Sequence, residues 1–312
     1  AWTGYTFVAN RYHLDDFPHR LLVFQKMFAV GAMAISAPDV VIAGDHTYFA
    51  LAFAVAQFII VIMYARAWRQ NDESRDYAFY WGGVFAVGGF IWLISVLCPA
   101  PWCYVLWAVG LLTVAFSPIS KQSRKLTDRY PLDLEHLAER YGLLTIIVLG
   151  ESFVKVLSYL AGAEHGTDMT YLFKGFLALF ITCSVWWIHF DDVAGSEVRE
   201  GRGNWIVWLY GHLPLAIAIT GMGVAVKKTI SFDFGAPPDP TYRWLLAATV
   251  ALVFFSVGII DSVTQRRVAH LSDRARINAR FGTALVVLLL GQVGGSMASG
   301  TYLSLIMAIC VA

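Results

Sequence analysis

The chain has 312 residues, of which 58% are hydrophobic and only 14% are charged, and its mean hydropathy is +0.60. Soluble domains are usually about 45–50% apolar and about 25% charged, so this composition excludes an ordinary soluble domain and predicts a polytopic protein of the lipid bilayer. The net charge of +1, without a basic block or a zinc-type cysteine spacing, argues against a nucleic-acid partner.

Hydropathy predicts an all-α fold with one partial helix at residues 2–10 and about ten full membrane spans, because about 20 apolar residues at about 1.5 Å each cross the hydrocarbon core. The spans are expected at residues 20–37, 47–66, 76–97, 102–118, 136–162, 170–190, 204–226, 242–261, 277–294 and 297–312. The first residue is Ala1 rather than Met, and the chain ends in an apolar run. We therefore expect both ends to be cut from a longer protein.

Positive charges are unevenly distributed between the two sides of these spans. The loops of one side hold fifteen Lys and Arg residues, and those of the other side hold three. The first set is Arg11, Arg20, Arg66, Arg69, Arg75, Lys121, Arg124, Lys125, Arg129, Arg199, Arg202, Arg266, Arg267, Arg274 and Arg276, and the second is Lys227, Lys228 and Arg243. Because cytoplasmic loops are enriched in Lys and Arg, we expect the C-terminus to lie in the cytoplasm.

The halves on either side of the polar stretch 117–135 share local patterns. Residues 2–5 (WTGY) are similar to residues 187–190 (WIHF), and Thr-Tyr opens a span at both 47–48 and 241–242. Apolar helices also resemble one another by composition alone, so both a true duplication and a chance likeness stay open.

A true duplication predicts three segments, at 1–120, 121–135 and 136–312. The first and third would be transmembrane repeats, joined by a basic cytoplasmic linker. An even number of spans gives two parallel six-helix repeats about an axis along the membrane normal. The first repeat would then lack its N-terminal helix or helices in this chain.

The span at 136–162 carries four charged side chains. At about 100° per residue, Glu139, Arg140, Glu151 and Lys155 fall within one arc of about 160°. Each charge in lipid costs about 2.5–3.5 kcal/mol, so we expect this arc to face protein or water. Two interpretations stay open: ion pairs that hold helices together, or a pathway in which Glu151 binds a proton, an ion or a polar substrate group.

A second candidate for the pathway is His212, which lies in a span just before Pro214. Proline frees a backbone carbonyl one turn earlier, and transporters use such broken helices to contact ions and substrates, although ordinary membrane helices also bend in this way. Gln25 and Lys26 lie at a comparable place in the first half. A pathway lined by both halves would contain all three side chains.

His189, Asp191 and Asp192 are weak candidates for a divalent-metal site at the inner end of their span, where polar residues also occur simply as the edge of a helix. Cys98 and Cys103 flank an outer turn, where a disulfide is chemically allowed but two buried thiols are equally ordinary. The chain has no nucleophile elbow, Walker loop, zinc-protease or haem motif, and we expect no cofactor.

Several stretches closely resemble the bacterial low temperature requirement A (LtrA) family. They are residues 138–152 (AERYGLLTIIVLGES), 187–192 (WIHFDD), 210–214 (YGHLP) and 5–11 (YTFVANR). The resemblance covers essentially the whole chain and implies a bacterial inner-membrane protein. Members of that family usually begin with another acidic apolar helix, which this sequence does not contain.

These patterns together predict a transporter or channel that moves a small solute or ion, with protonation of Glu151 as the coupling step. The alternatives are an integral-membrane enzyme that uses His189, Asp191 and Asp192 at the inner surface, and a receptor or structural protein that transports nothing. The sequence leaves the solute, the coupling ion and assembly into a homo-oligomer open.

Overall fold

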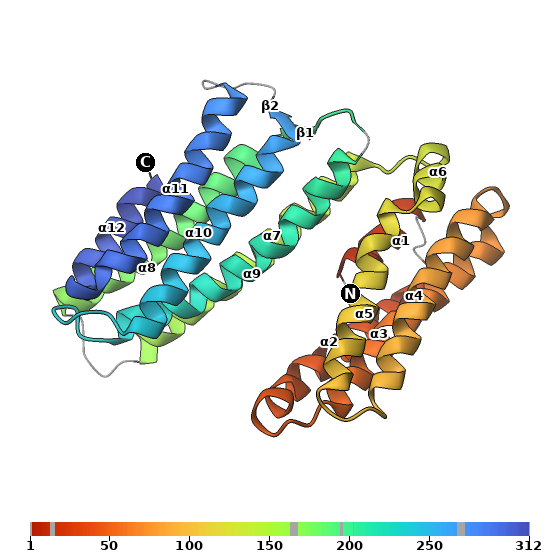
Figure 1. Cartoon of the computed structure of the whole chain (residues 1–312), viewed down its shortest axis with the longest axis horizontal. Helices are drawn as coiled ribbons and strands as arrows, with labels where there is room; N and C mark the ends of the chain where they lie inside the picture. The colour runs from red at the N-terminus through yellow and green to blue at the C-terminus, as the bar shows by residue number, and fades with distance from the viewer. Residues whose placement is uncertain are drawn as a thin grey trace. The chain divides into compact units, whose positions relative to one another are not determined.

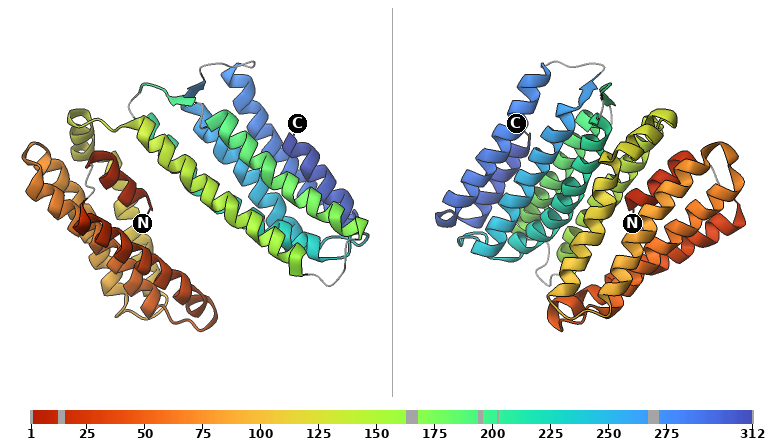
Figure 2. Two further views of the ribbon diagram at one scale, coloured as in Figure 1. Left: turned by 180° about the vertical axis from the view of Figure 1, so that it is seen from behind. Right: turned by 45° about the vertical axis from the view of Figure 1, so that its right-hand side comes forward.

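The computed structural model describes residues 2–12, 16–162, 168–193, 196–201, 203–266 and 272–311. The chain divides into two compact units, which we call unit 1 (Ala1–Leu137) and unit 2 (Ala138–Ala312). Each unit is a bundle of helices (Figures 1 and 2). In the described residues the only other regular element is a ribbon of two short strands, so the expected all-α fold class is confirmed.

Unit 1 is built around its third helix. Its described elements are α1 (Trp2–Arg11), α2 (Phe17–Ile42), α3 (Thr47–Gln70), η1 (Asp72–Ser74), α4 (Arg75–Ser95), α5 (Trp102–Phe116), η2 (Ser117–Ile119) and α6 (Lys121–Arg129). The helix α3 packs against α1, α2 and α4. Its side chains Ile60, Met63 and Tyr64 are fully buried, as expected for a helix that is apolar on all sides.

The segment 121–135, expected to be a cytoplasmic linker, packs as part of unit 1. Leu126 and Tyr130 are buried in the same core as α3 and α4. The Tyr130 hydroxyl donates a hydrogen bond to Asp76 Oδ1 at 2.9 Å. The basic residues of α6 therefore lie on a helix that is anchored by an apolar side and by an aromatic residue.

Unit 2 contains the rest of the spans. Its elements are α7 (Leu134–Gly162, which begins in the last residues of unit 1), α8 (Met169–Ile188), the π-helical turn η3 (His189–Val193), β1 (Ser196–Val198), α9 (Asn204–Ser231), α10 (Pro240–Ser262), β2 (Thr264–Arg266), α11 (Asp273–Val293), η4 (Gly294–Ser296) and α12 (Ser299–Val311). The central helix is α10, which packs between α9 and α11. Its residues Leu246, Val250, Val253, Val257 and Ile260 are completely buried at spacings of three and four.

The two strands tie the segment after α8 to the segment after α10. They are antiparallel, with Glu197 opposite Gln265 and Val198 opposite Thr264. The backbone N–H of Arg199 extends the ladder by donating to Val263 O at 2.9 Å. The ribbon thus holds together the connections that lead into α9 and α11.

The helix α7 packs against α9 at a point of close approach. The Ser152 hydroxyl is fully buried and lies 3.1 Å from Ile219 O, to which it donates. Gly223 of α9 faces Ser152, and a Cβ atom added there would lie 2.4 Å from Ser152 Oγ and 2.9 Å from Ser152 Cα. Small residues allow membrane helices to approach in this way, so the contact depends on the missing side chain of Gly223.

Nine described helices are long and apolar enough to cross a membrane, by length and composition. They correspond to the first nine of the ten expected spans. The tenth, expected at 297–312, contains the apolar helix α12 of 13 residues, which is shorter than a full span. The multi-pass membrane character is therefore confirmed, while the count of ten full spans is not.

Replacing Gly223 with alanine tests the contact between α7 and α9. We expect Gly223→Ala to lower the free energy of unfolding by about 1–3 kcal/mol, because the new methyl group meets the Ser152 backbone as well as its side chain. Thermal unfolding of the detergent-purified protein measures the effect. The control is Gly282→Ala in α11, where the added methyl group meets nothing within 4 Å. Equal stability of Gly223→Ala and wild type would contradict the predicted contact.

Candidate functional site

Two buried histidines meet inside unit 2. His189 opens the π-helical turn η3 at the end of α8, and His212 lies in the first half of α9. Their ring centroids are 5.9 Å apart and the rings are almost perpendicular, at 88°. The side chains are only 1% and 3% exposed. The structure therefore brings together two residues, here called the histidine pair, that the sequence placed in separate candidate sites.

Aromatic rings surround His212. The Trp208 ring centroid lies 4.4 Å and the Tyr141 ring centroid 5.0 Å from that of His212. His212 Nδ1 is 2.8 Å from the backbone oxygen of Trp208. Because a carbonyl oxygen can only accept a hydrogen bond, Nδ1 carries the proton in the neutral ring, and Nε2 keeps its lone pair.

One nitrogen on each ring lacks a hydrogen bond. His189 Nδ1 and His212 Nε2 are both buried, and neither has a partner in the part of the chain that the structure describes. Each such group costs about 1–3 kcal/mol when it is removed from water. Buried polar atoms are satisfied in most native sites, so this pair of atoms marks a place where a ligand would stabilise the protein.

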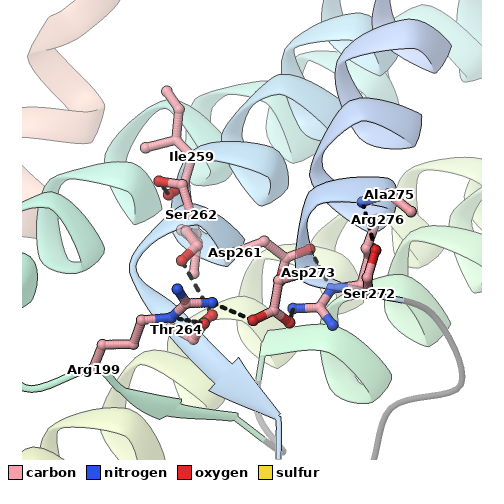
Figure 3. Close-up of polar contacts among 10 residues, drawn as sticks. Arg199, Ile259, Asp261, Ser262, Thr264, Ser272, Asp273, Ala275 and Arg276 are labelled. Carbon is pink, nitrogen blue, oxygen red and sulfur yellow. Dashed lines mark hydrogen bonds and ion pairs between the residues drawn. The ribbon is translucent and has the colours of Figure 1, made fainter.

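A buried ion pair joins α10 to α11. Arg276 Nε lies 3.2 Å from Asp261 Oδ2, and the two side chains are 6% and 0% exposed. The same guanidinium approaches Asp273 Oδ1, with Nη2 at 3.4 Å. Figure 3 shows both carboxylates beside Arg276. Arg276 is therefore held by two acidic residues from two helices.

The same network reaches the ribbon. Arg199, just after β1, forms a short ion pair with Asp273. Its Nε donates to Thr264 O in β2 at 2.8 Å. These contacts are also visible in Figure 3. Arg199, Asp261, Asp273 and Arg276 thus link the segment after β1 to α10 and α11.

The four side chains of the charged arc of α7 differ in exposure. Glu151 is 58% exposed, and its Oε1 lies 3.3 Å from Nζ of the half-buried Lys155. Glu139 is exposed and Arg140 is half-buried. Glu151 and Lys155, four residues apart, therefore form an ion pair within α7.

The structure separates the two candidates of the first half. Lys26 of α2 is buried, and its Nζ lies 4.5 Å from the centroid of the Tyr5 ring in α1. Gln25 is exposed. Adjacent residues of a helix point about 100° apart, so only Lys26 faces the interior of unit 1.

The weak candidates for a metal site are not grouped in the described residues, and the two cysteines of the possible disulfide are not bonded. Asp191 is exposed while His189 is buried, and the side chain of Asp192 lies outside the described residues. The described residues contain no group of three or more His, Cys, Asp or Glu side chains that could hold a metal. Cys98 and Cys103 are both free thiols, so the predicted disulfide is absent from this structure.

Comparison with known proteins identifies the family. The model of the bacterial low temperature requirement A protein (LtrA) matches residues 1–312, the whole chain. The chain belongs to this family. The resemblance carried by its motifs is thereby confirmed.

One relative is the uncharacterized protein RA0937 of Rhizobium meliloti (strain 1021). It is 26% identical over 278 residues, which cover 83% of this chain and 65% of that protein. The LtrA chain thus spans about two thirds of the length of this relative. No solved structure matches the chain.

Sequence reasoning on this LtrA protein missed the ion pair of α10 and α11. Arg276 was counted only as a loop charge, and Asp261 only as the last residue of a predicted span. The available signal was an aspartate that directly follows the long apolar run of residues 244–260. An acidic side chain in that place needs a partner from a neighbouring helix.

Substitutions in this LtrA protein can measure the ion pair. Removing one charge, as in Asp261→Ala, leaves Arg276 buried without its main partner, and we expect a loss of about 3–5 kcal/mol in the free energy of unfolding. The double variant Asp261→Leu with Arg276→Met should recover most of that loss. Thermal unfolding in detergent supplies the measurement. Asp72→Ala, which removes an exposed partner of Arg75, is the control and should change little. Additive losses in the double variant would contradict a direct pair.

Proposed function

We propose that this protein is a transporter that moves a small solute or ion across the bacterial inner membrane, with proton movement coupled through Glu151. The observation that carries the proposal is the Glu151–Lys155 pair on a helix long enough to span the bilayer, in which Glu151 is 58% exposed. Lipid does not tolerate such an open ion pair. Water, solute or polar protein groups must therefore meet this face of α7.

The spacing along α7 supports a path rather than a single surface site. Glu139 and Glu151 are twelve residues apart, which corresponds to about 18 Å along the helix axis. Carboxylates at two depths on one helix face can pass a cation or a proton from one level of the membrane to another. Lys155 next to Glu151 balances the charge while the carboxylate is ionised and competes with any incoming cation.

A two-repeat architecture supports the same function. The Thr-Tyr pairs at 47–48 and 241–242 lie at or just after the first residues of α3 and α10, and each of these helices packs between its two neighbours in its own unit. Buried Lys26 in α2 and buried His212 in α9 occupy the helices that precede them. In this proposal the units are parallel repeats, the C-terminus is cytoplasmic, and Lys26 and His212 are the inward-facing polar groups of the pathway.

Proton flux tests the coupling role. The protein is reconstituted into liposomes that contain a pH-sensitive dye. A membrane potential is then imposed, with and without each of a panel of external solutes. We expect Glu151→Gln to lower proton flux at least tenfold, because an amide cannot bind and release a proton. Glu200→Gln, at an exposed position outside the spans, should leave the flux unchanged.

The experiment also discriminates between classes of protein. Unchanged flux in a folded Glu151→Gln variant would refute the coupling role of Glu151. Absence of flux in wild type with every solute would refute transport of those solutes and favour a receptor. Chemical conversion of a solute without vectorial movement would favour an enzyme. Size-exclusion chromatography confirms that each variant is folded.

A further inference from the structure

We infer that His189 and His212 form a binding site for one transition-metal cation inside unit 2. The ligand set is new, because the metal site expected from the sequence used His189 with Asp191 and Asp192. The inference does not depend on the proposed transport. The inference concerns equilibrium binding of a metal ion, which is measurable on the detergent-purified protein without any transport.

The separation of the rings suits one shared ion. A ring nitrogen lies about 1.15 Å from its ring centroid, and bonds from a metal to histidine nitrogen are about 2.0–2.1 Å long. Two imidazoles on one ion therefore have centroids about 5.2 Å apart at a tetrahedral angle and about 6.4 Å apart at a linear angle. The observed separation of 5.9 Å lies within this interval.

The donor atoms are available. His212 donates Nδ1–H to Trp208 O, which leaves the Nε2 lone pair for a metal. Histidine ligands of metals almost always place their other N–H on a carbonyl, carboxylate or water in this way. His189 Nδ1 is likewise buried without a hydrogen-bond partner. Each ring thus offers one nitrogen, and neither nitrogen is engaged by the described protein.

The local backbone is also typical of a functional position. His189 begins the π-helical turn His189–Val193, and such turns often occur at functional sites. His212 lies two residues before Pro214 in α9. Since the two histidines come from successive spans, a metal bound to both would join the end of α8 to α9 within unit 2.

The chemistry of the ligands selects the class of metal. Neutral imidazole nitrogens suit copper, zinc and nickel, whereas calcium and magnesium prefer oxygen ligands. Two protein nitrogens satisfy a two-coordinate ion such as Cu⁺ and leave further positions open on Zn²⁺ or Ni²⁺ for water or a bound solute. We therefore expect Cu⁺, Zn²⁺ and Ni²⁺ to bind, and Ca²⁺ and Mg²⁺ not to bind.

Metal retention tests the site directly. The full chain, freed of any affinity tag, is stripped with a chelator in detergent and loaded separately with Cu⁺ under reducing conditions, Zn²⁺, Ni²⁺, Ca²⁺ or Mg²⁺. Elemental analysis after desalting then gives the metal bound per protein. We expect about one equivalent of at least one of the first three ions, and at least tenfold weaker binding in His189→Ala, in His212→Ala and in the double variant. His46→Ala, which removes a histidine of unit 1, is the matched control and should bind as wild type does.

A second measurement uses only the wild-type protein, so its result does not depend on whether the variants fold. X-ray absorption of the loaded wild-type protein should show two imidazole nitrogens on the metal. Absence of any retained transition metal, retention that persists in the double variant, or a metal without imidazole ligands would each overturn the inference. These measurements do not depend on the proton flux of Glu151→Gln. The metal site and the proposed transport are therefore tested independently.

Discussion

A polar group buried between membrane-spanning helices has no water to replace its lost hydrogen bonds, and this constraint governs unit 2. Its polar residues meet the constraint in three ways. Asp261 and Arg276 neutralise each other at 3.2 Å. Glu151 and Lys155 pair with each other at 3.3 Å along α7. His189 and His212 meet it only in part, because one buried ring nitrogen of each has no hydrogen-bond partner among the described residues.

The Asp261–Arg276 pair contributes more to position than to stability. Two charges at about 4 Å attract by about 4 kcal/mol at an effective dielectric constant of 20, while burying each ion costs several kcal/mol. The attraction therefore does not exceed the cost of burying the two ions, and the pair adds no net stability. Its effect is to hold α10 and α11 in one register, since any sliding that separates the charges loses the attraction and keeps the cost of burial.

The sequence was sufficient to predict features that depend on local pattern. Hydropathy located the spans, and helical periodicity placed Glu151 and Lys155 within reach of each other. Contacts between helices were not predictable, because they depend on how each helix is rotated and which helix lies beside it. Along the sequence, the rest of the turn η3, the strand β1 and a loop lie between His189 and His212. The strand β2 lies between Asp261 and Arg276. The weak candidates His189 and Asp191 differ in exposure within the turn η3, where His189 is buried and Asp191 is exposed.

The ribbon β1–β2 has a mechanical consequence for unit 2. Its backbone hydrogen bonds, together with the Arg199–Asp273 pair, join the start of α9, the end of α10 and the start of α11. These helix ends cannot separate without breaking several bonds at once. At the opposite end, the loop between α9 and α10 is also held, because the backbone N–H groups of Ser299 and Gly300 in α12 donate to Ala236 O and Phe234 O at 2.8 and 3.0 Å. The pair α9–α10 is therefore tied at both ends, to α11 through the ribbon and to α12 through this loop, which restricts relative tilting of these helices.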